Sequence, residues 1–267
     1  MKIFLTIAAL FFCALTFAQN DSSYVLIGSY KGDVVDAAVD NLGNLYVISS
    51  QGQIKKYNAA GDSVGIYNQV RNFGKSFSID VSNPLKVLLF YKDFSTVVVL
   101  DRYLSGITTV NLKNFNILQP AAVGLSYDNN IWVYDEYDSK LKKINEQGDL
   151  ILETPDLRAA LSFNLSPQKI INDNGLVYVA DTTAGIFVFD NYGSFKKKVP
   201  LVNWQSIGIS KNTVTSVDKE LITVYNTSTL MQSQKRHPFY KADARSFISG
   251  DKFVTFSSHQ LQVYRQR

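Results

Sequence analysis

Ile54-Lys-Lys-Tyr-Asn58 is the first of six related segments that recur along the chain. Each is a short apolar strand pattern, and the first five run directly into an Asn or Asp. The later copies are Val97-Val-Val-Leu-Asp101, Leu141-Lys-Lys-Ile-Asn145, Ile186-Phe-Val-Phe-Asp190, Ile222-Thr-Val-Tyr-Asn226 and Leu261-Gln-Val-Tyr-Arg265. A motif repeated in this way predicts a protein built from similar structural units.

A second apolar run precedes each copy. Its equivalent residues, spaced by 42, 44, 46, 36 and 40 positions, are Tyr46, Leu88, Trp132, Tyr178, Val214 and Val254. A further run rich in Ala, Gly and Ser comes before it, as the crowded centre of a ring requires, and Gly, Asn and Asp mark the turns. This spacing predicts an all-β fold, a six-bladed β-propeller of four-stranded antiparallel blades.

The two ends of the chain predict how the ring closes. The sixth repeat reaches Arg267 with three strands and no room for a fourth, whereas Tyr24-Val-Leu-Ile-Gly28 is a strand that belongs to no repeat. Pairing the two ends would remove two open sheet edges. We therefore expect the N-terminal strand to complete the last blade as its outer strand.

The N-terminus has the layout of a secretory signal peptide. Lys2 is followed by an apolar run and by Ala18-Gln19, so we expect cleavage after Ala18, a signal peptide at 1–18 and a single propeller domain at 19–267. Cys13, the one cysteine, leaves with the signal, which excludes disulfides and thiolate metal sites from the mature chain. The expected location is periplasmic, outer-membrane associated or secreted, with no transmembrane segment after cleavage.

Charge gives no indication of a nucleic-acid partner. The chain has 27 Lys and Arg against 23 Asp and Glu, and the small cluster Lys196-Lys-Lys198 is interpreted as solvated residues on an outer strand.

The first repeat carries a family resemblance. Asp40-Asn-Leu-Gly-Asn-Leu-Tyr-Val47, followed by Ile54-Lys-Lys-Tyr57 and a Gly-Asp turn, resembles the NHL repeats and related six-bladed propellers of the TolB-like group. The signal ending Thr16-Phe-Ala-Gln19 is similar to those of exported Bacteroidota proteins. These resemblances imply the fold and an envelope location, and they transfer no activity.

Candidate site residues are expected on one face, where the loops between second and third strands gather with the links between blades. The binding candidates there are Asp135, Glu136, Tyr137, Asp138, Arg158, Asp181, Trp204 and His259. Several of these carboxylates, together with Asp218, could supply oxygen ligands to calcium, although ordinary turn carboxylates explain the same pattern. Since His237 and His259 fall in different loops and no nucleophile motif is present, both are interpreted as surface histidines and no catalytic residue is predicted.

The longest link, residues 154–167, is half apolar. Its Leu157, Leu161, Phe163 and Leu165 form either an exposed patch for a protein partner or a segment that folds back and buries them. The leading hypothesis is a non-enzymatic protein–protein interaction module with a protein partner in the cell envelope, such as an accessory subunit of an outer-membrane, secretion or gliding assembly. The alternative is a calcium-dependent hydrolase or lyase, or a glycan-binding propeller, with its site at the channel mouth.

Overall fold

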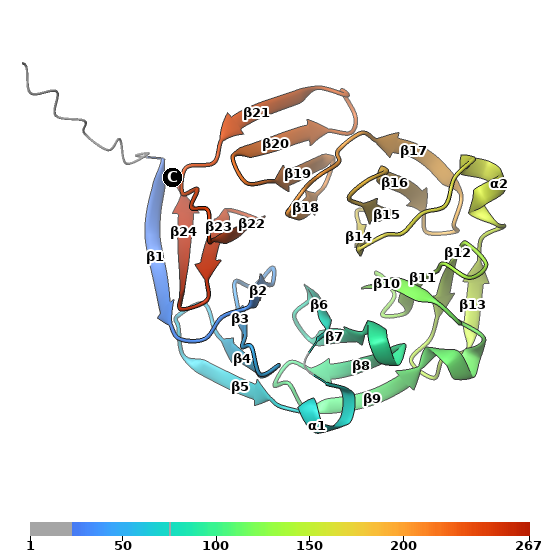
Figure 1. Ribbon diagram of the computed structural model, residues 1–267, viewed down its shortest axis with the longest axis horizontal. Helices are drawn as coiled ribbons and strands as arrows, with labels where there is room; N and C mark the ends of the chain where they lie inside the picture. Colours follow the sequence, from blue (N-terminus) through green and yellow to red (C-terminus); the bar gives the residue numbers. More distant parts are fainter. Residues whose placement is uncertain (1–22, 75) are drawn as a thin grey trace, which may run out of the picture.

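A computed structural model describes residues 23–74 and 76–267, without the side chains of Val70 and Arg71. The chain forms six four-stranded antiparallel sheets, which stand around a central channel as the blades of a propeller (Figure 1). The predicted fold is thereby confirmed. The predicted signal peptide lies outside the described residues.

The strands of the first five blades run in chain order from the channel to the rim. Blade 1 consists of β2 (Asp36–Val39), β3 (Leu45–Ile48), β4 (Ile54–Tyr57) and β5 (Ser63–Tyr67). Blade 2 consists of β6 (Ser78–Asn83), β7 (Lys86–Tyr91), β8 (Thr96–Asp101) and β9 (Gly106–Asn111). Blade 3 consists of β10 (Pro120–Leu125), β11 (Ile131–Asp135), β12 (Lys140–Ile144) and β13 (Leu150–Glu153), and blade 4 of β14 (Lys169–Asp173), β15 (Leu176–Asp181), β16 (Gly185–Asp190) and β17 (Phe195–Val199). Blade 5 is β18 (Ser206–Ser210), β19 (Thr213–Val217), β20 (Leu221–Asn226) and β21 (Gln232–Arg236).

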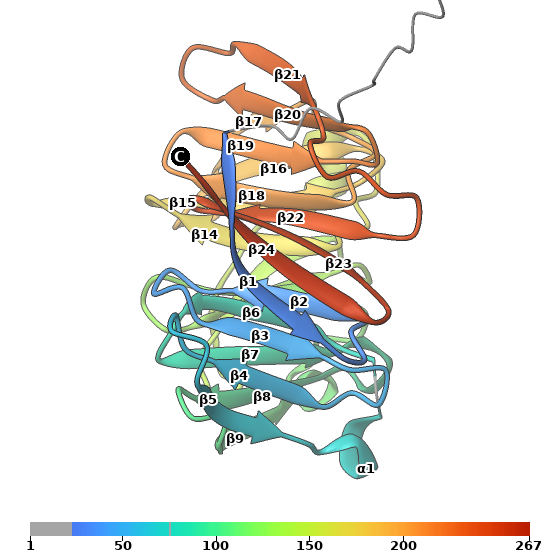
Figure 2. The same cartoon turned by 90° about the vertical axis from the view of Figure 1, so that its left-hand side faces the viewer.

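The last blade combines both ends of the chain. It contains β22 (Arg245–Ser249), β23 (Lys252–Ser257) and β24 (Gln260–Gln266), and its outer strand is β1 (Tyr24–Lys31), as predicted. The antiparallel register runs from Tyr24 opposite Gln266 to Lys31 opposite Gln260, with one irregularity between Leu26 and Gly28. Figures 1 and 2 show β1 beside β24, so strand pairing closes the ring.

Among the residues that the structure describes, the helices are short and lie outside the sheets. They are α1 (Val70–Phe73), η1 (Lys92–Phe94), η2 (Leu112–Phe115) and α2 (Leu157–Leu161). Within the described ranges, none of the helices is both long enough and apolar enough to cross a membrane.

The core lies between the faces of neighbouring blades. Strand residues such as Trp132, Tyr178 and Phe187 are almost completely buried there. Near the channel, the strand backbones of neighbouring blades lie close to one another. A Cβ atom built on Gly124, for example, would lie 2.4 Å from the carbonyl oxygen of Ile170 in the next blade. This close approach explains the small residues expected in the innermost strands.

The lysine cluster lies on β17, the outer strand of blade 4, as predicted. Lys196 forms an ion pair of 2.8 Å with Asp190, and the ammonium group of Lys198 lies 5.5 Å from the ring centre of Phe163. The cluster is therefore part of the rim packing.

Removing residues 22–30 should lower the melting temperature by more than about 10 °C, because the deletion exposes the edge of β24 and removes most of one strand ladder. Thermal unfolding followed by circular dichroism measures the effect. A synthetic peptide of residues 23–31 should restore part of the loss, and an unchanged melting temperature would show that β1 does not hold the ring closed.

Gly124→Ala should reduce the free energy of unfolding by about 1–3 kcal/mol, because the methyl group would overlap the Ile170 carbonyl. Gly106→Ala is the matched control, since a Cβ atom at Gly106 meets no atom within 4 Å. Urea titration should place the control within about 0.5 kcal/mol of the wild type. Equal effects of the two substitutions would contradict the steric explanation.

Candidate functional site on the loop face

Two kinds of connection share one face of the ring, which we call the loop face. They are the loops between second and third strands and the links between blades, and backbone hydrogen bonds join them around the ring. The link–loop bonds run from Leu112 N to Ser95 O, Leu157 N to Ser139 O, Asn203 N to Thr182 O, His237 N to Glu220 O and Gly32 N to His259 O, at 2.7–3.0 Å. The opposite side, which carries the remaining turns, is the turn face.

Asp135 ends β11 and is fully buried beneath the loop face. Its carboxylate accepts hydrogen bonds from the backbone N–H groups of Leu118 and Gln119 in the preceding link, at 3.2 and 2.9 Å. It also forms an ion pair of 2.9 Å with Lys142. The same ammonium group lies 2.7 Å from Asp138. Burial opposes the charge on Lys142, but the two carboxylates outweigh burial and raise its pKa. Asp135 and Asp138 therefore stabilise the blade internally, through bonds to the preceding link and to Lys142.

Glu136 and Asp181 meet through the link between blades 3 and 4. The hydroxyl of Ser166 donates to Glu136 at 2.5 Å, while its backbone N–H donates to Asp181 at 2.8 Å. Asp181 also accepts bonds from Thr183 and Ala184. Burial would raise the pKa of Asp181, but these hydrogen bonds hold it below the ordinary value.

A calcium site, which the sequence left open as an alternative, would have to draw on carboxylates that are already engaged. Calcium takes six to eight oxygen ligands, whereas the oxygens of Asp135 and Asp181 already accept hydrogen bonds from N–H groups or lie beside an ammonium group. Within residues 23–74 and 76–267, no three His, Cys, Asp or Glu side chains come together as metal ligands. The arrangement is better described as a set of turn carboxylates that support the architecture than as a metal site.

The long link is partly buried and partly exposed. Leu157 and Leu165 are buried, Leu161 is half-buried and Phe163 remains exposed while its ring contacts Phe187. Of the two alternatives, burial therefore holds for Leu157 and Leu165, which the interblade core takes up, and exposure holds for Phe163. Arg158, on the exposed side of α2, pairs with Asp156 at 2.6 Å.

The two histidines lie in different environments. His259 is exposed in the loop between β23 and β24, as expected. His237 was expected at the surface, but the structure buries it against Phe253, with ring centres 4.9 Å apart. Burial lowers the pKa of His237, and its Nδ1 accepts a bond of 3.1 Å from the backbone of Phe239. His237 is therefore a neutral core residue at pH 7.

Trp204 is the predicted residue that lies beside a pocket. The pocket measures about 530 Å³ and opens between the link from β17 to β18 and the loop from β19 to β20. Its lining residues are Asn203, Trp204, Gln205, Asp218, Lys219, Glu220 and Leu221. Tyr137 is exposed in the corresponding loop of blade 3.

Charged residues at the channel mouth were not among the predicted site residues. Asp36, Lys169 and Arg245 are the first residues of inner strands β2, β14 and β22, and Arg245 approaches Asp36 to 3.9 Å. Lys169 remains accessible to water in the channel, yet removal from bulk solvent lowers its pKa, with Asp80 and Asp36 opposing the effect. Aligning the first position of each inner strand in the sequence would have found this group.

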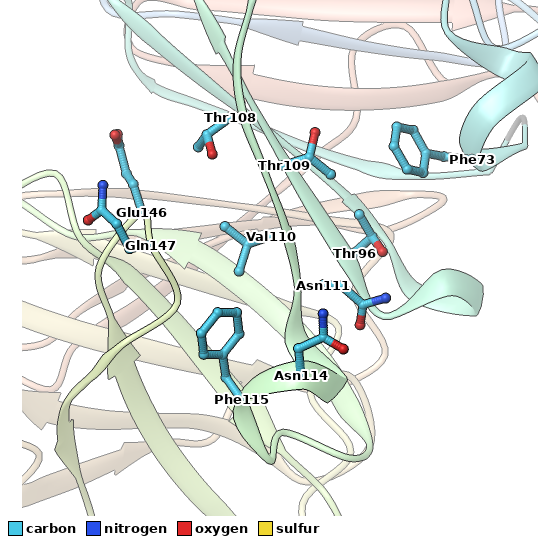
Figure 3. A pocket seen from close by; sticks show the side chains of 10 residues that line it. All are labelled: Phe73, Thr96, Thr108, Thr109, Val110, Asn111, Asn114, Phe115, Glu146 and Gln147. Carbon is cyan, nitrogen blue, oxygen red and sulfur yellow. The ribbon is translucent and has the colours of Figure 1, made fainter.

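A second hollow, of about 540 Å³, lies at the rim beside β9 (Figure 3). Its lining includes four consecutive strand residues, Thr108, Thr109, Val110 and Asn111. Successive strand residues point to opposite faces, and Figure 3 shows them on both sides of the strand. A single ligand could not contact them all, so this hollow is not a built site.

Comparison with known proteins establishes similarity of fold alone. No family model matches the chain, and no curated protein matches its sequence. The structure of the Pan2 WD40 domain of Neurospora crassa superposes with a TM-score of 0.64 and 11% sequence identity, and the match covers 91% of this chain and 95% of that one. A catalytically inactive His-to-Ala variant of virginiamycin B lyase from Staphylococcus aureus, solved with quinupristin, has a TM-score of 0.62 and 11% sequence identity, and the match covers 90% of this chain and 99% of that one. A streptogramin B lyase has a TM-score of 0.59 and 15% identity, with 86% of this chain and 78% of that one covered. The NHL or TolB-like type stays a prediction.

Asp181→Asn should lower stability at neutral pH by about 1–3 kcal/mol, because the amide cannot accept all the bonds of the carboxylate. The folded-state pKa of Asp181 lies below the ordinary aspartate value of 3.8. The contribution of its charged form to stability is therefore present above the ordinary value and disappears as the pH falls through the folded value. The variant should therefore lose less stability than the wild type between about pH 5 and pH 2. Denaturant titrations across this range measure it.

Asp93→Asn is the matched control for this experiment, because Asp93 is exposed on η1 and its side chain has no hydrogen bond or ion pair to the described residues. Its acid profile should follow the wild type. An Asp181→Asn profile that also parallels the wild type would contradict the assigned role.

Proposed function

We propose that this chain is an exported, non-enzymatic propeller that binds a protein partner of the cell envelope through its loop face. The observation that carries the proposal is the distribution of exposed large apolar side chains over that face. Five inter-blade links each leave at least one of them more than a third exposed, including Val35, Leu118, Phe163, Val202 and Tyr240. The loops add Phe94 and Tyr137.

The rigidity of the loop face supports this proposal. The link–loop bonds fix the link backbone against the blades, so these side chains are presented with little conformational freedom. Aromatic and aliphatic residues held in this way are typical anchors of protein interfaces. The propeller fold itself fits a protein-interaction module.

The chemistry of the polar residues also supports a non-enzymatic role. The carboxylates expected to act on a ligand are engaged in bonds to the links, and His237 and His259 lie in different parts of the last two blades. Both a WD40 domain and lyases have similar folds, so the fold alone does not separate binding from catalysis.

The cellular setting rests on the sequence. The signal-like segment at 1–18 and its similarity to exported Bacteroidota proteins support a periplasmic or outer-membrane location. An accessory subunit of an outer-membrane, secretion or gliding assembly would need a rigid protein-binding face of this kind.

Capture from the native cell envelope tests the proposal. A loop-face variant, Tyr137→Ala with Val202→Ser and Tyr240→Ala, should recover about tenfold less of any specific partner than the wild type, because it removes three apolar anchors. The matched control carries Leu42→Ser, Leu85→Ser and Tyr192→Ala on the turn face, where large side chains are also exposed. Both variants must retain the wild-type melting temperature.

Equal loss of capture in the two variants would contradict the assignment to the loop face. One calcium ion retained per chain after dialysis would favour the alternative of a calcium-dependent hydrolase, lyase or glycan-binding propeller.

A further inference from the structure

The pocket beside Trp204 is preformed by backbone bonds. Asn203 N donates to Thr182 O at 2.7 Å and Gln205 N donates to Val217 O at 2.8 Å, which fixes both sides of the indole. Across the pocket, Asp218 Oδ1 accepts from the backbone of Glu220 and Leu221, which fixes the loop. A ligand would therefore meet walls that are already in place.

The pocket has an acidic balance. Asp218 uses one oxygen for its loop, and the described residues offer no hydrogen bond or ion pair to its other oxygen or to the Glu220 carboxylate. Lys219 is the one cationic side chain in the lining, so two carboxylates leave a net charge of −1. Of the nearest basic residues outside the lining, His237 has a pKa lowered by burial, and Arg236 is exposed on the outer strand opposite Leu221.

The aromatic wall suits a cation. Trp204 packs against the core between blades 4 and 5, and its buried Nε1–H has no acceptor among the described residues. Packing alone therefore holds the ring in place. Indole rings attract ammonium and guanidinium groups, most strongly where solvent is partly excluded.

We infer that the Trp204 pocket receives a basic side chain, arginine or lysine, from the protein partner. The inference rests on the proposed function and names the chemistry of one contact on the same face. The charged end pairs with Glu220 and Asp218, and the aliphatic stem lies along the indole.

Nuclear magnetic resonance can observe this pocket directly, because the chain has two tryptophans and thus two indole N–H signals. Trp132 is fully buried in blade 3 and serves as an internal reference. The ¹⁵N-labelled protein from Gln19 onward, which contains the whole ring, is titrated with N-acetyl-arginine methylamide, and Trp204→Phe assigns the signals. The Trp204 signal should shift saturably while the Trp132 signal stays fixed.

Charge specificity is tested in the same titration. N-acetyl-lysine methylamide should also shift the Trp204 signal, whereas the glutamate and norleucine analogues should not. Glu220→Gln should weaken arginine binding by about threefold or more, and Asp93→Asn should leave it unchanged. No saturable shift, an equal response to the glutamate analogue, or an equal loss in Asp93→Asn would overturn the inference.

Capture by Glu220→Gln separates the two proposals. If this variant retains full capture and the titration shows no binding, the pocket inference fails while the loop-face proposal stands. If the titration succeeds but the loop-face variant loses no partner, the proposed function fails, and the pocket is a site for free basic ligands instead of a contact with a partner.

Discussion

The pairing of β1 with β24 is the constraint on which the remaining structure depends. β1 contributes Tyr30 to the core between blades 6 and 1 and Tyr24 to the core between blades 5 and 6, so both interfaces of the last blade lose packing when β1 leaves β24. β1 can therefore pair only after β24, the last strand of the described residues, has been synthesised. This long-range closure makes slow folding and exposed strand edges an expected feature of the incomplete chain.

The polar residues below the loop face extend the same constraint. Asp135 and Asp181 occur at the ends of second strands and hold the preceding links through backbone N–H groups. A cluster of carboxylates at a channel mouth therefore has a structural explanation in this protein. The proposed binding therefore rests on the exposed apolar side chains and on the pocket beside Trp204.

The architecture could be predicted because its information is local and repeated. Alternating apolar residues, turn residues and the shortfall of one strand after Leu261 predict six blades and their closure without any knowledge of side-chain contacts. The site was less accessible. The sequence placed Asp135, Glu136, Asp181 and Trp204 on one face, where the structure also has them. It could not show that Ser166 and Lys142 bond to the carboxylates. Nor could it decide between exposure and burial for Leu165, or indicate that His237 would be buried, because their partners lie far away in sequence.

The link–loop bonds have a consequence for how this surface can change over evolutionary time. Their donors are backbone N–H groups of Gly32, Leu112, Leu157, Asn203 and His237, five positions occupied by four chemically different residue types. Because the bonds do not depend on side-chain chemistry, many substitutions on the loop face leave the ring intact. A lineage could therefore exchange one binding specificity for another on an unchanged scaffold.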